Sequence, residues 1–475
     1  MDKPKPSLSG GSQASPARWM SMADPIHGIV QFDRYHPAHQ LVLAVMNSGP
    51  MQRLRRIRQM GLAEFVFPNA THSRFVHSVG ATHLMMEALA VLQRDAVGRE
   101  LLAQPYPGCS TPLETLLLLA ILVHDIGHAP LSHTLEELLE LDQRGLSHDY
   151  YWNRKILMED PELQKIWQQI DPNLPEALLS VMGHGPHDPH PALGVEKQPQ
   201  PQHFLASLVS SQLDMDRLDY LLRDSHFLGV RYGNIESQRI VSTLVLAHNQ
   251  LNQPVVAVRE EAVPAVEHYL FGRHEAYKMA LHPLDKAAEV TLKKTLLRFR
   301  WVREEGLETG YPADILYQFL ANPETLSTSD YLSLDDHSIW EAAKGWSRES
   351  QDPMLKSLAN RLLRHELFKF LDLRAYGINA HSLHDLPEAY QALAKHYESR
   401  GLSMSFGFEE VILRPKPLYR SDNEPIWIKT ARGEVVDLKE VSSLPLSHPL
   451  NPRTERHLIF VWDSEAKKVL RQALR

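Results

Sequence analysis

The stretch from Leu113 to Glu137 constrains the fold more than any other part of the chain. An apolar run, Leu116 to Val123, leads directly into His124 and Asp125. The run is long enough for a buried helix but well short of the roughly 20 apolar residues that a membrane span needs. A buried imidazole beside a carboxylate is costly unless a partner satisfies both groups. A divalent metal ion is one such partner, and a His–Asp hydrogen bond that closes a core helix at Gly127 is the other.

The composition is that of a soluble globular protein with a sizeable core, since 43% of the 475 residues are hydrophobic and 23% are charged. The formal net charge of −8 argues against a generally basic nucleic-acid-binding protein. Cys109 is the only cysteine, which excludes an intramolecular disulfide and a cysteine-based zinc site. The first residues show no apolar stretch typical of a secretory signal. We therefore expect a cytoplasmic protein that does not enter a membrane.

Three regions are predicted along the chain. Residues 1–20 are rich in Ser, Gly, Pro and Lys, which predicts a disordered tail. Residues 21–375 carry helical periodicities and are predicted to form a helical core, with a Pro- and His-rich surface insert at 184–203. Residues 376–475 contain alternating and β-branched stretches between turn residues, which predicts a small α+β lobe. The expected fold class is mainly α.

Two further helical stretches carry polar residues that a core helix does not need. His77 lies inside one predicted helix, where a lone histidine is most often a satisfied core residue. In the stretch from Phe204 to Ser225, Asp216, Tyr220 and Asp224 follow at spacings of four and share one helix face. Because leucines surround this acidic stripe, it needs a partner or a solvent-filled cleft.

His77, His124, Asp125 and Asp216 are the ligand-type residues that stand out, on three separate predicted helices. In them the chain resembles the HD-domain superfamily, whose pattern is H…HD…D. It most resembles dNTP triphosphohydrolases of the SAM-and-HD-domain type, without a stretch that resembles the SAM domain. The resemblance covers most of residues 22–475 and is far more specific than the HD dipeptide. It rests, in order, on DPIHG (24–28), QRLRRIRQMG (52–61), FPNATHSRFVHSVG (67–80), HDIGHAPLSH (124–133), DMDRLDYLLRDSHFLG (214–229) and SDYLSLDD (329–336).

The resemblance implies that His77, His124, Asp125 and Asp216 ligate one divalent metal ion. A nitrogen and oxygen ligand set without sulfur suits Fe, Mn, Ni, Zn or Mg, and the sequence does not choose among them. The resemblance also implies that Mg²⁺ accompanies a triphosphate substrate.

A substrate site is implied in the same way. Gln59 matches a residue that reads the sugar, Tyr220 one that packs on the deoxyribose where a 2′-hydroxyl would clash, and Asp224 one that contacts the 3′-hydroxyl. Arg74 and Arg273 match residues that bind phosphate through their forked donors.

The implied reaction is attack of water on the α-phosphorus of a dNTP, which releases deoxynucleoside and inorganic triphosphate. His128, His133 and His148 follow the HD pair, and a histidine can titrate near neutrality and donate a proton to a leaving oxygen. His133 is the predicted general acid, and Glu136 is predicted to hold its tautomer. The family usually has Asp where Glu136 stands, so the distance to the acid changes by one methylene.

Other departures concern substrate and effector binding. Ala280 and Pro283 stand where the family has a substrate-contacting Tyr and Lys, which leaves base and phosphate preference open. Tetrameric relatives bind activating nucleotides between subunits, so the resemblance implies a homo-oligomer, tetramer or dimer, with such a site. Ala23 and Asn47 replace an Asn and a guanine-reading Asp there, whereas Arg55 is retained.

Two other functions are left open by the sequence. The same metal site suits a phosphatase or phosphodiesterase acting on other nucleotides or on single-stranded nucleic acid. A non-catalytic nucleotide sensor would keep the fold and change its oligomeric state without turnover. The residues alone, without the resemblance, indicate a metal-dependent enzyme that acts on a phosphorylated ligand.

Overall fold

The structure is a computed structural model, and it describes residues 17–183, 204–377, 386–414, 417–419, 425–444, 446 and 455–474. Most of the predicted tail and the whole predicted insert at 184–203 lie outside the described residues. Strand β1 begins at Trp19, so regular structure starts inside the stretch predicted as a tail.

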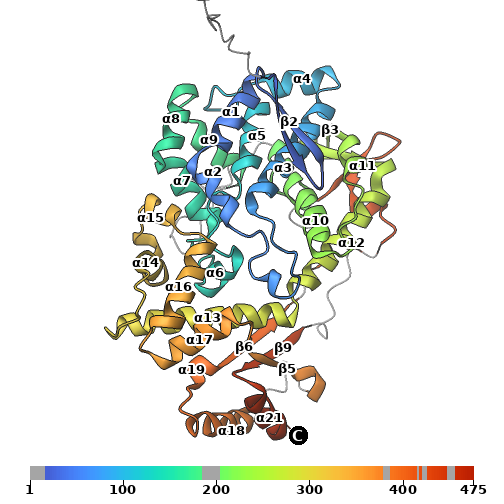
Figure 1. Ribbon diagram of the computed structural model, residues 1–475. Helices are drawn as coiled ribbons and strands as arrows, with labels where there is room; N and C mark the ends of the chain where they lie inside the picture. The colour runs from blue at the N-terminus through green and yellow to red at the C-terminus, as the bar shows by residue number, and fades with distance from the viewer. Residues whose placement is uncertain are drawn as a thin grey trace, which may run out of the picture.

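The fold is mainly α, as predicted (Figure 1). The upper body contains α1 (Pro37–Met46), α2 (Gly49–Arg53), α3 (Arg74–Leu92), α4 (Ala96–Ala103), α5 (Leu113–Val123), α6 (His133–Leu138), α7 (Asn153–Glu159), α8 (Pro161–Ile170), α9 (Leu174–Val181), α10 (Met215–Leu228), α11 (Ser237–Ser242) and α12 (Val263–Ala280). The chain continues with α13 (Pro283–Glu304), α14 (Asp314–Ala321), α15 (Thr328–Ser333), α16 (Asp336–Glu349), α17 (Pro353–Leu363), α18 (Leu386–Glu398), α19 (Met404–Gly407), α20 (Leu438–Val441) and α21 (Ser464–Ala473).

Helix α5 lies in the middle of the upper body because its sequence is apolar on every side. Residues Leu116 to Val123 are at most 1% exposed. Helices α1, α3 and α9 pack around α5, and α10 packs on α3. The helix ends at Val123, so the sequence delivers His124 and Asp125 to an interior position. The predicted core helix is confirmed.

Helix α3 is the one helix in the described part of the chain that is long and apolar enough to cross a membrane. Of its apolar window, 67% is buried inside the protein. Because α5 and α10 cover it, its apolar surface belongs to the core.

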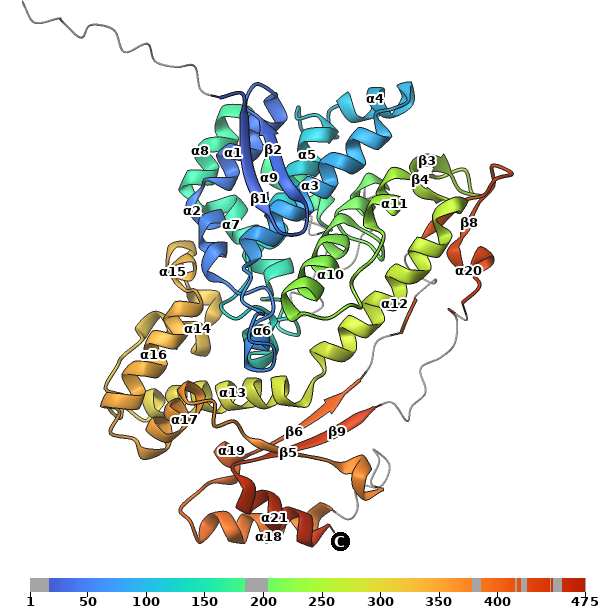
Figure 2. The same cartoon turned by 45° about the vertical axis from the view of Figure 1, so that its right-hand side comes forward.

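The N-terminal strands β1 (Trp19–Asp24) and β2 (Gly28–Asp33) form an antiparallel hairpin (Figure 2). Pro25 begins the turn that joins the two strands, and Gly28 begins β2. Gly28 has φ +74°, in the left-handed region that favours glycine.

The predicted strands of the C-terminal stretch divide between two sheets. One has the order β5-β9-β6 and contains β5 (Lys369–Asp372), β6 (Phe408–Leu413) and β9 (Arg456–Val461). The other has the order β3-β4-β7-β8 and contains β3 (Leu244–His248), β4 (Pro254–Arg259), β7 (Trp427–Lys429) and β8 (Val435–Asp437). Strand β7 runs parallel to β4, with Ala257 opposite Trp427. The α+β character is as predicted, but alternation of residue type does not specify which strand is the partner.

One helix boundary differs from that predicted, and one helical segment begins without a side-chain cap. The stretch from Phe204 to Ser225 is not one helix, because Asp214 ends the irregular segment and caps α10 by accepting a hydrogen bond from the backbone of Arg217 at 2.7 Å. Ser147 occupies the position before the π-helical turn His148–Trp152, but its side chain makes no capping hydrogen bond. A serine before a helical stretch commonly caps it, but Ser147 does not.

Candidate metal centre and active site

Three helices bring the ligand-type side chains together. His77 lies near the start of α3, His124 and Asp125 directly follow α5, and Asp216 is in the first turn of α10. Nε2 of His77 lies 3.2 Å from Nε2 of His124 and 3.0 Å from Oδ1 of Asp216. Nε2 of His124 lies 3.4 Å from Oδ1 of Asp125 and 3.5 Å from Oδ1 of Asp216. The structure thus places the predicted ligands around one point.

Hydrogen bonds on the far side of each imidazole aim its Nε2 at this point. Nδ1 of His77 donates to Oδ2 of Asp219 at 2.8 Å, and Nδ1 of His124 donates to the carbonyl oxygen of Ile121 at 2.7 Å. In its neutral form, each ring therefore has its lone pair on Nε2. Two lone pairs and two carboxylates that face one another repel unless a cation lies among them.

The spacing of the donor atoms fits a single metal ion. Two ligand atoms, each about 2.0–2.2 Å from one ion, lie roughly 3 to 3.6 Å apart, and the separations above run from 3.0 to 3.5 Å. Burial opposes a charge on His77, yet the carboxylates of Asp216 and Asp219 raise its pKa to about 10. The site therefore stabilises positive charge. His77, His124 and Asp125 form a buried cluster that can hold a divalent metal, and the donor set leaves the identity of the ion open.

Asp219 is a supporting residue that the sequence reasoning missed. Its carboxylate is fully buried and binds His27 at 2.6 Å, His77 at 2.8 Å and the guanidinium of Arg223 at 2.8 and 2.9 Å. Arg223 also donates to Asp24 at 2.8 Å. Asp24 and His27 belong to the DPIHG stretch, so that stretch holds in place the Asp219 carboxylate and Arg223, and Asp219 orients the predicted ligand His77. A carboxylate on the far nitrogen of a metal-binding histidine fixes the ring and increases its basicity.

Arg74 contacts a predicted metal ligand directly. Its Nη1 donates to Oδ2 of Asp125 at 2.6 Å, and its Nε donates to Oγ of Ser132 at 2.7 Å. The remaining Nη2 makes a long contact of 3.4 Å to the carbonyl oxygen of Gln59. Arg74 therefore holds Asp125 in place, and Nη2 is the donor best placed for the predicted phosphate contact.

Of the predicted substrate residues, Tyr220 contacts a predicted metal ligand, and Asp224 and Gln59 both contact His72. The ring centroid of Tyr220 is 6.5 Å from that of His77, and burial holds the pKa of the Tyr220 hydroxyl well above its usual value. Farther along α10, Asp224 binds Nε2 of His72 at 2.7 Å. The backbone N–H of Gln59 donates to the carbonyl oxygen of His72 at 3.0 Å. Tyr220, Asp224 and Gln59 are thus connected in space, and their sugar-binding roles stay predictions.

Arg273, on α12, is held by backbone carbonyl groups. Its Nη1 donates to the carbonyl oxygen of Gln212 and its Nη2 to that of Leu418, each at 2.9 Å. The side chain is buried, with its guanidinium 5.7 Å from the ring centroid of Tyr269. A phosphate contact would require Arg273 to release these carbonyl groups, so that role stays a prediction.

The predicted catalytic residues form a second cluster around Glu136. The Glu136 carboxylate is 3.1 Å from Nδ1 of His133 and 2.8 Å from Nδ1 of His148. His128 connects the two clusters, since its Nε2 lies 3.1 Å from Oδ1 of Asp125. The side chain of His133 is 62% exposed, whereas those of His128 and His148 are 1% and 7% exposed. Of these histidines, His133 is therefore the one that faces solvent.

Burial and neighbouring charges determine which histidine of the Glu136 cluster is favoured in its charged form. Burial opposes a charge on His148, but the carboxylates of Asp149 and Glu136 hold its pKa well above the usual value. Burial, together with the charges of Arg74 and His148, holds the pKa of His128 well below the usual value. The surroundings therefore favour the charged form of His148 and the neutral form of His128.

The geometry of the Glu136 cluster suits proton transfer better than metal binding, although its nitrogen and oxygen atoms lie within 4.8 Å of one another. The rings of His128 and His148 stack, with centroids 3.5 Å apart and planes inclined by 25°. Imidazole binds a metal in its ring plane at about 2 Å. Two nearly parallel rings cannot both do so with one ion.

Asn153 is a second residue that the sequence reasoning missed. Its Nδ2 donates to the carbonyl oxygen of His124 at 2.6 Å, and its Oδ1 accepts from the backbone of Gly127 at 2.7 Å. A Cβ on Gly127 would lie 2.5 Å from the backbone nitrogen of Asn153, so this position has no room for a side chain. Asn153 holds the turn that carries the His–Asp pair, but no local pattern marks it in the sequence.

Comparisons with known proteins agree with this geometry. No family model matches the chain. The chain is 28% identical over 466 residues to the uncharacterized protein YwfO of Bacillus subtilis, and the match covers 95% of this chain and 96% of YwfO. It is 25% identical to the deoxynucleoside triphosphate triphosphohydrolase SAMHD1 of Gallus gallus, over 73% of this chain and 55% of that protein.

A SAMHD1 homolog of Dictyostelium discoideum is 30% identical over 216 residues, which are 43% of this chain and 36% of that protein. The chain therefore spans about half, or less, of the SAMHD1 proteins that it matches. Among solved structures, a phosphohydrolase from Bacteroides thetaiotaomicron aligns with a TM-score of 0.71 and 27% identity, over 93% of this chain and 99% of that one. These similarities and the converging His and Asp side chains support an HD-type phosphohydrolase.

Proposed function

We propose that the protein is a metal-dependent deoxynucleoside triphosphate triphosphohydrolase, which converts a dNTP and water to deoxynucleoside and inorganic triphosphate. The observation that carries the proposal is the contact between two clusters. A His and Asp ligand set suited to a phosphate-binding metal lies beside a solvent-facing His133, which Glu136 holds. The similarity to SAMHD1 proteins, which are named for this activity, favours dNTPs as the substrates.

The metal would be held by His77, His124, Asp125 and Asp216, and it would supply Lewis-acid polarisation of a phosphoryl oxygen. Arg74 fixes Asp125 through their 2.6 Å contact. Asp219 fixes the ring of His77, and the Ile121 carbonyl fixes that of His124. The ligands are therefore oriented before substrate binds, which lowers the reorganisation needed during reaction.

His133 is the proposed general acid. Attack of water on the α-phosphorus breaks the bond from that phosphorus to the 5′-oxygen, and the oxygen of water stays on the triphosphate. The departing 5′-oxygen takes a proton from His133, and the attacking water releases one to solvent. Because Glu136 binds Nδ1 of His133, Nε2 carries the donated proton. The solvent-exposed His133 then regains its proton from water, while His148 donates to the same Glu136 carboxylate from the other side.

The direct experiment is to incubate purified protein with each dNTP and each rNTP, with Mn²⁺ or Mg²⁺, and to separate the products by chromatography. We expect deoxynucleoside and intact triphosphate from dNTPs only, since Tyr220 is proposed to exclude the 2′-hydroxyl. His124→Ala should abolish turnover, and His133→Ala should slow it roughly 10²- to 10⁴-fold. His226→Ala, at an exposed position near the end of α10, serves as the control and should leave the rate unchanged.

Pairs of nucleotides test for an activator, which we propose to bind between subunits of a homo-oligomer. Release of orthophosphate or a nucleoside monophosphate would exclude the triphosphohydrolase and assign the same metal site to a phosphatase or phosphodiesterase. Binding of dNTPs and a change of sedimentation without turnover, in every mixture, would indicate a nucleotide sensor.

A further inference from the structure

His72 is a buried histidine to which the proposed reaction assigns no role. It lies just before Ser73, the residue that precedes α3, and its side chain is fully buried. Its Nε2 contacts Oδ1 of Asp224 at 2.7 Å, whereas its Nδ1 is buried without a hydrogen-bond partner among the described residues. A buried polar atom is nearly always hydrogen-bonded, so a histidine that served only the core would use both ring nitrogens. The ring is therefore placed for its contact with Asp224.

In the contact between His72 and Asp224, the imidazole is the donor. An ionised carboxylate only accepts hydrogen bonds, so Nε2 of His72 carries the proton and donates to Oδ1 of Asp224. A second proton on Nδ1 would leave a buried N–H without an acceptor, which is costly. His72 thus uses one oxygen of the Asp224 carboxylate and leaves the other, Oδ2, able to accept from a ligand.

The orientation of the His72 ring is fixed by stacking. Its plane is inclined by 19° to that of Phe227, with ring centroids 4.6 Å apart. Phe227 follows Asp224 by three residues on α10, so both side chains lie on the same face of that helix. His72 covers this face, with its plane on Phe227 and its Nε2 edge toward Asp224. The stack therefore sets the direction of the donated N–H.

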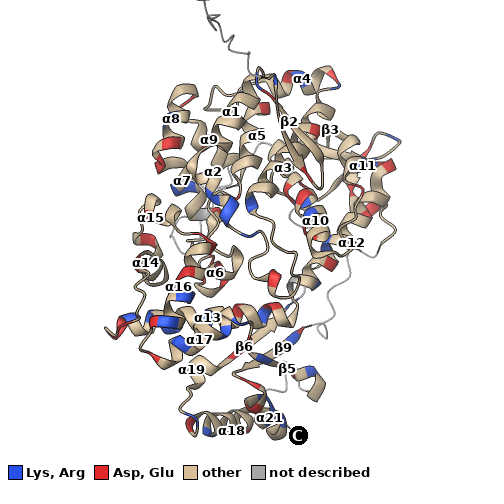
Figure 3. Cartoon of the chain, in the orientation of Figure 1, with Lys and Arg blue, Asp and Glu red and all other residues tan. Residues whose placement is uncertain are grey.

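Asp224 has no other hydrogen-bond partner in the described part of the chain. Figure 3 shows basic as well as acidic residues on α10, but its two arginines bind elsewhere. Arg217 and Arg223 donate to two other aspartates, at 3.2 and 2.8 Å. The side chain of Asp224 is 14% exposed, so its carboxylate borders open space instead of being enclosed. His72 is therefore the residue that sets the direction of this carboxylate.

The backbone of His72 holds a second residue of the predicted sugar site. Its carbonyl oxygen accepts from the backbone N–H of Gln59, and the N–H of Arg74 donates to the carbonyl oxygen of Ile57, each at 3.0 Å. These two bonds pair residues 57–59 antiparallel with residues 72–74. Oε1 of Gln59 is buried and has no hydrogen-bond partner among the described residues. His72 thus joins Gln59 and Asp224, and each of these two residues has an acceptor oxygen that no described residue uses.

We propose that His72 is a positioning residue for the sugar of the substrate. By donating to Asp224 it aims the unused carboxylate oxygen at the 3′-hydroxyl, and so makes the protein select nucleotides that carry this hydroxyl. The inference rests on the proposed function, which places the sugar beside Tyr220 and Asp224. Asp224 follows the predicted metal ligand Asp216 by eight residues, about 12 Å along the helix axis. Because the contact is far from the reacting phosphorus, its loss should raise KM more than it lowers kcat.

Turnover of a dNTP and of its 2′,3′-dideoxy analogue measures this role directly. The parent should prefer the dNTP in kcat/KM by roughly 10- to 100-fold, the usual effect of losing a hydrogen bond to a charged group. His72→Phe keeps the stack on Phe227 and removes the donor. It should reduce the preference to about threefold or less, mainly through a higher KM for the dNTP. His72→Gln offers an amide N–H toward Asp224 and should retain most of the preference.

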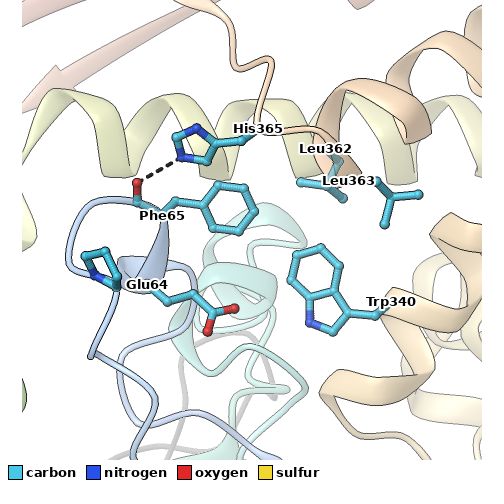
Figure 4. Close-up of a pocket in the computed structure, with 7 residues that line it drawn as sticks. Glu64, Phe65, Trp340, Leu362, Leu363 and His365 are labelled. Carbon is cyan, nitrogen blue, oxygen red and sulfur yellow. Dashed lines mark hydrogen bonds between the residues drawn. The ribbon is translucent and has the colours of Figure 1, made fainter.

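His365 provides a matched control (Figure 4). Like His72 it stacks on a phenylalanine, with ring centroids 5.0 Å apart, and its Nε2 donates a hydrogen bond, to the carbonyl oxygen of Phe65 at 2.9 Å. Unlike His72 it is exposed, and no described contact joins it to a predicted metal or substrate residue. His365→Phe should therefore leave the preference for the 3′-hydroxyl unchanged.

Two results would overturn the proposal. If His72→Phe, with the circular dichroism of the parent, slows the dNTP and its dideoxy analogue by the same factor, His72 has only a structural role. If the parent releases triphosphate from both nucleotides equally well, the triphosphohydrolase assignment stands and the selection of the 3′-hydroxyl does not.

Calorimetric titration with the same two nucleotides in the His124→Ala background needs no turnover, and it separates this proposal from the proposed reaction. A preference for the dNTP that disappears when His72→Phe is added supports the positioning role, even if the parent releases no triphosphate and the reaction is assigned wrongly. Equal affinity for the two nucleotides would overturn the positioning role, whatever the reaction.

Discussion

At the scale of single residues, the metal centre depends on side chains that touch no metal. Asp219 binds four donor atoms of His27, His77 and Arg223, so its charge balances a buried guanidinium and fixes a ligand at once. Removal of one partner from such a buried set typically costs about 3–5 kcal/mol. Loss of a carboxylate behind a metal-binding histidine typically costs 10- to 100-fold in metal affinity or activity.

Asp219→Asn is therefore expected to lower the affinity for Mn²⁺ by roughly 10- to 100-fold and to lower the melting temperature. Calorimetry on the folded fraction measures the first effect, and circular dichroism the second. Asp95→Asn is the control, since Asp95 caps α4 and Asn caps a helix equally well. If the folded variant binds Mn²⁺ as tightly as the parent, Asp219 does not position His77.

Glu136 sets the protonation of its neighbours, so its removal should change the pH dependence of turnover. The carboxylates of Asp149 and Glu136 hold the pKa of His148 well above its usual value, against the effect of burial. In Glu136→Gln one of these carboxylates is lost, the pKa of His148 falls, and the charged form disappears at a lower pH. We expect kcat to fall and its alkaline limb to move to lower pH, with KM little changed. A lower kcat with an unshifted profile would contradict this role.

At the scale of elements, the sequence predicted what is local and missed what depends on packing. The apolar run of α5 specifies a helix buried on all sides, and burial of Leu116 to Val123 confirms it. The convergence of His77, His124, Asp125 and Asp216 is a property of the fold, and it was reached through the family resemblance. Asn153 could not be identified from the sequence, because its role depends on hydrogen bonds to a turn that is distant along the chain. An acid four residues before an arginine on one helix was the available sign for Asp219.

The contact of α3 with α10 is the element on which the centre depends. A Cβ on Gly80 of α3 would lie 2.1 Å from Oδ1 of Asp219 and 2.2 Å from Nη2 of Arg223. Alanine in place of a helical glycine usually stabilises by about 0.4–1 kcal/mol. Gly80→Ala should instead destabilise by about 1–3 kcal/mol and weaken Mn²⁺ binding, because the helices must separate. Urea unfolding and metal titration measure both effects, and a stabilised variant with intact affinity would refute the close packing.

At the scale of the whole molecule, α13 joins the catalytic body to the C-terminal lobe. It packs on α6, which carries His133, and on α17, β5 and β9. Where α13 meets α6, Lys286 lies 2.7 Å from Glu289 and 3.5 Å from Glu137. The adjacent Asp285 is 9% exposed, and its Oδ1 has no hydrogen-bond partner among the described residues. Burial, with a further contribution from Glu289, raises the pKa of Asp285 to about 8.

Asp285 should therefore make stability fall as the pH rises. The unfolded chain releases this proton near pH 4, as ordinary aspartate does, whereas the folded protein keeps it until about pH 8. The folded state binds more protons between these values, so its stability decreases across that window and the full cost is present above pH 8. Asp285→Asn has no proton to lose and should melt at a higher temperature than the parent at pH 9, with the difference shrinking toward pH 5. Asp142→Asn, at an exposed position, is the control. If the difference in melting temperature between the parent and Asp285→Asn is the same at every pH, Asp285 is already ionised at neutral pH.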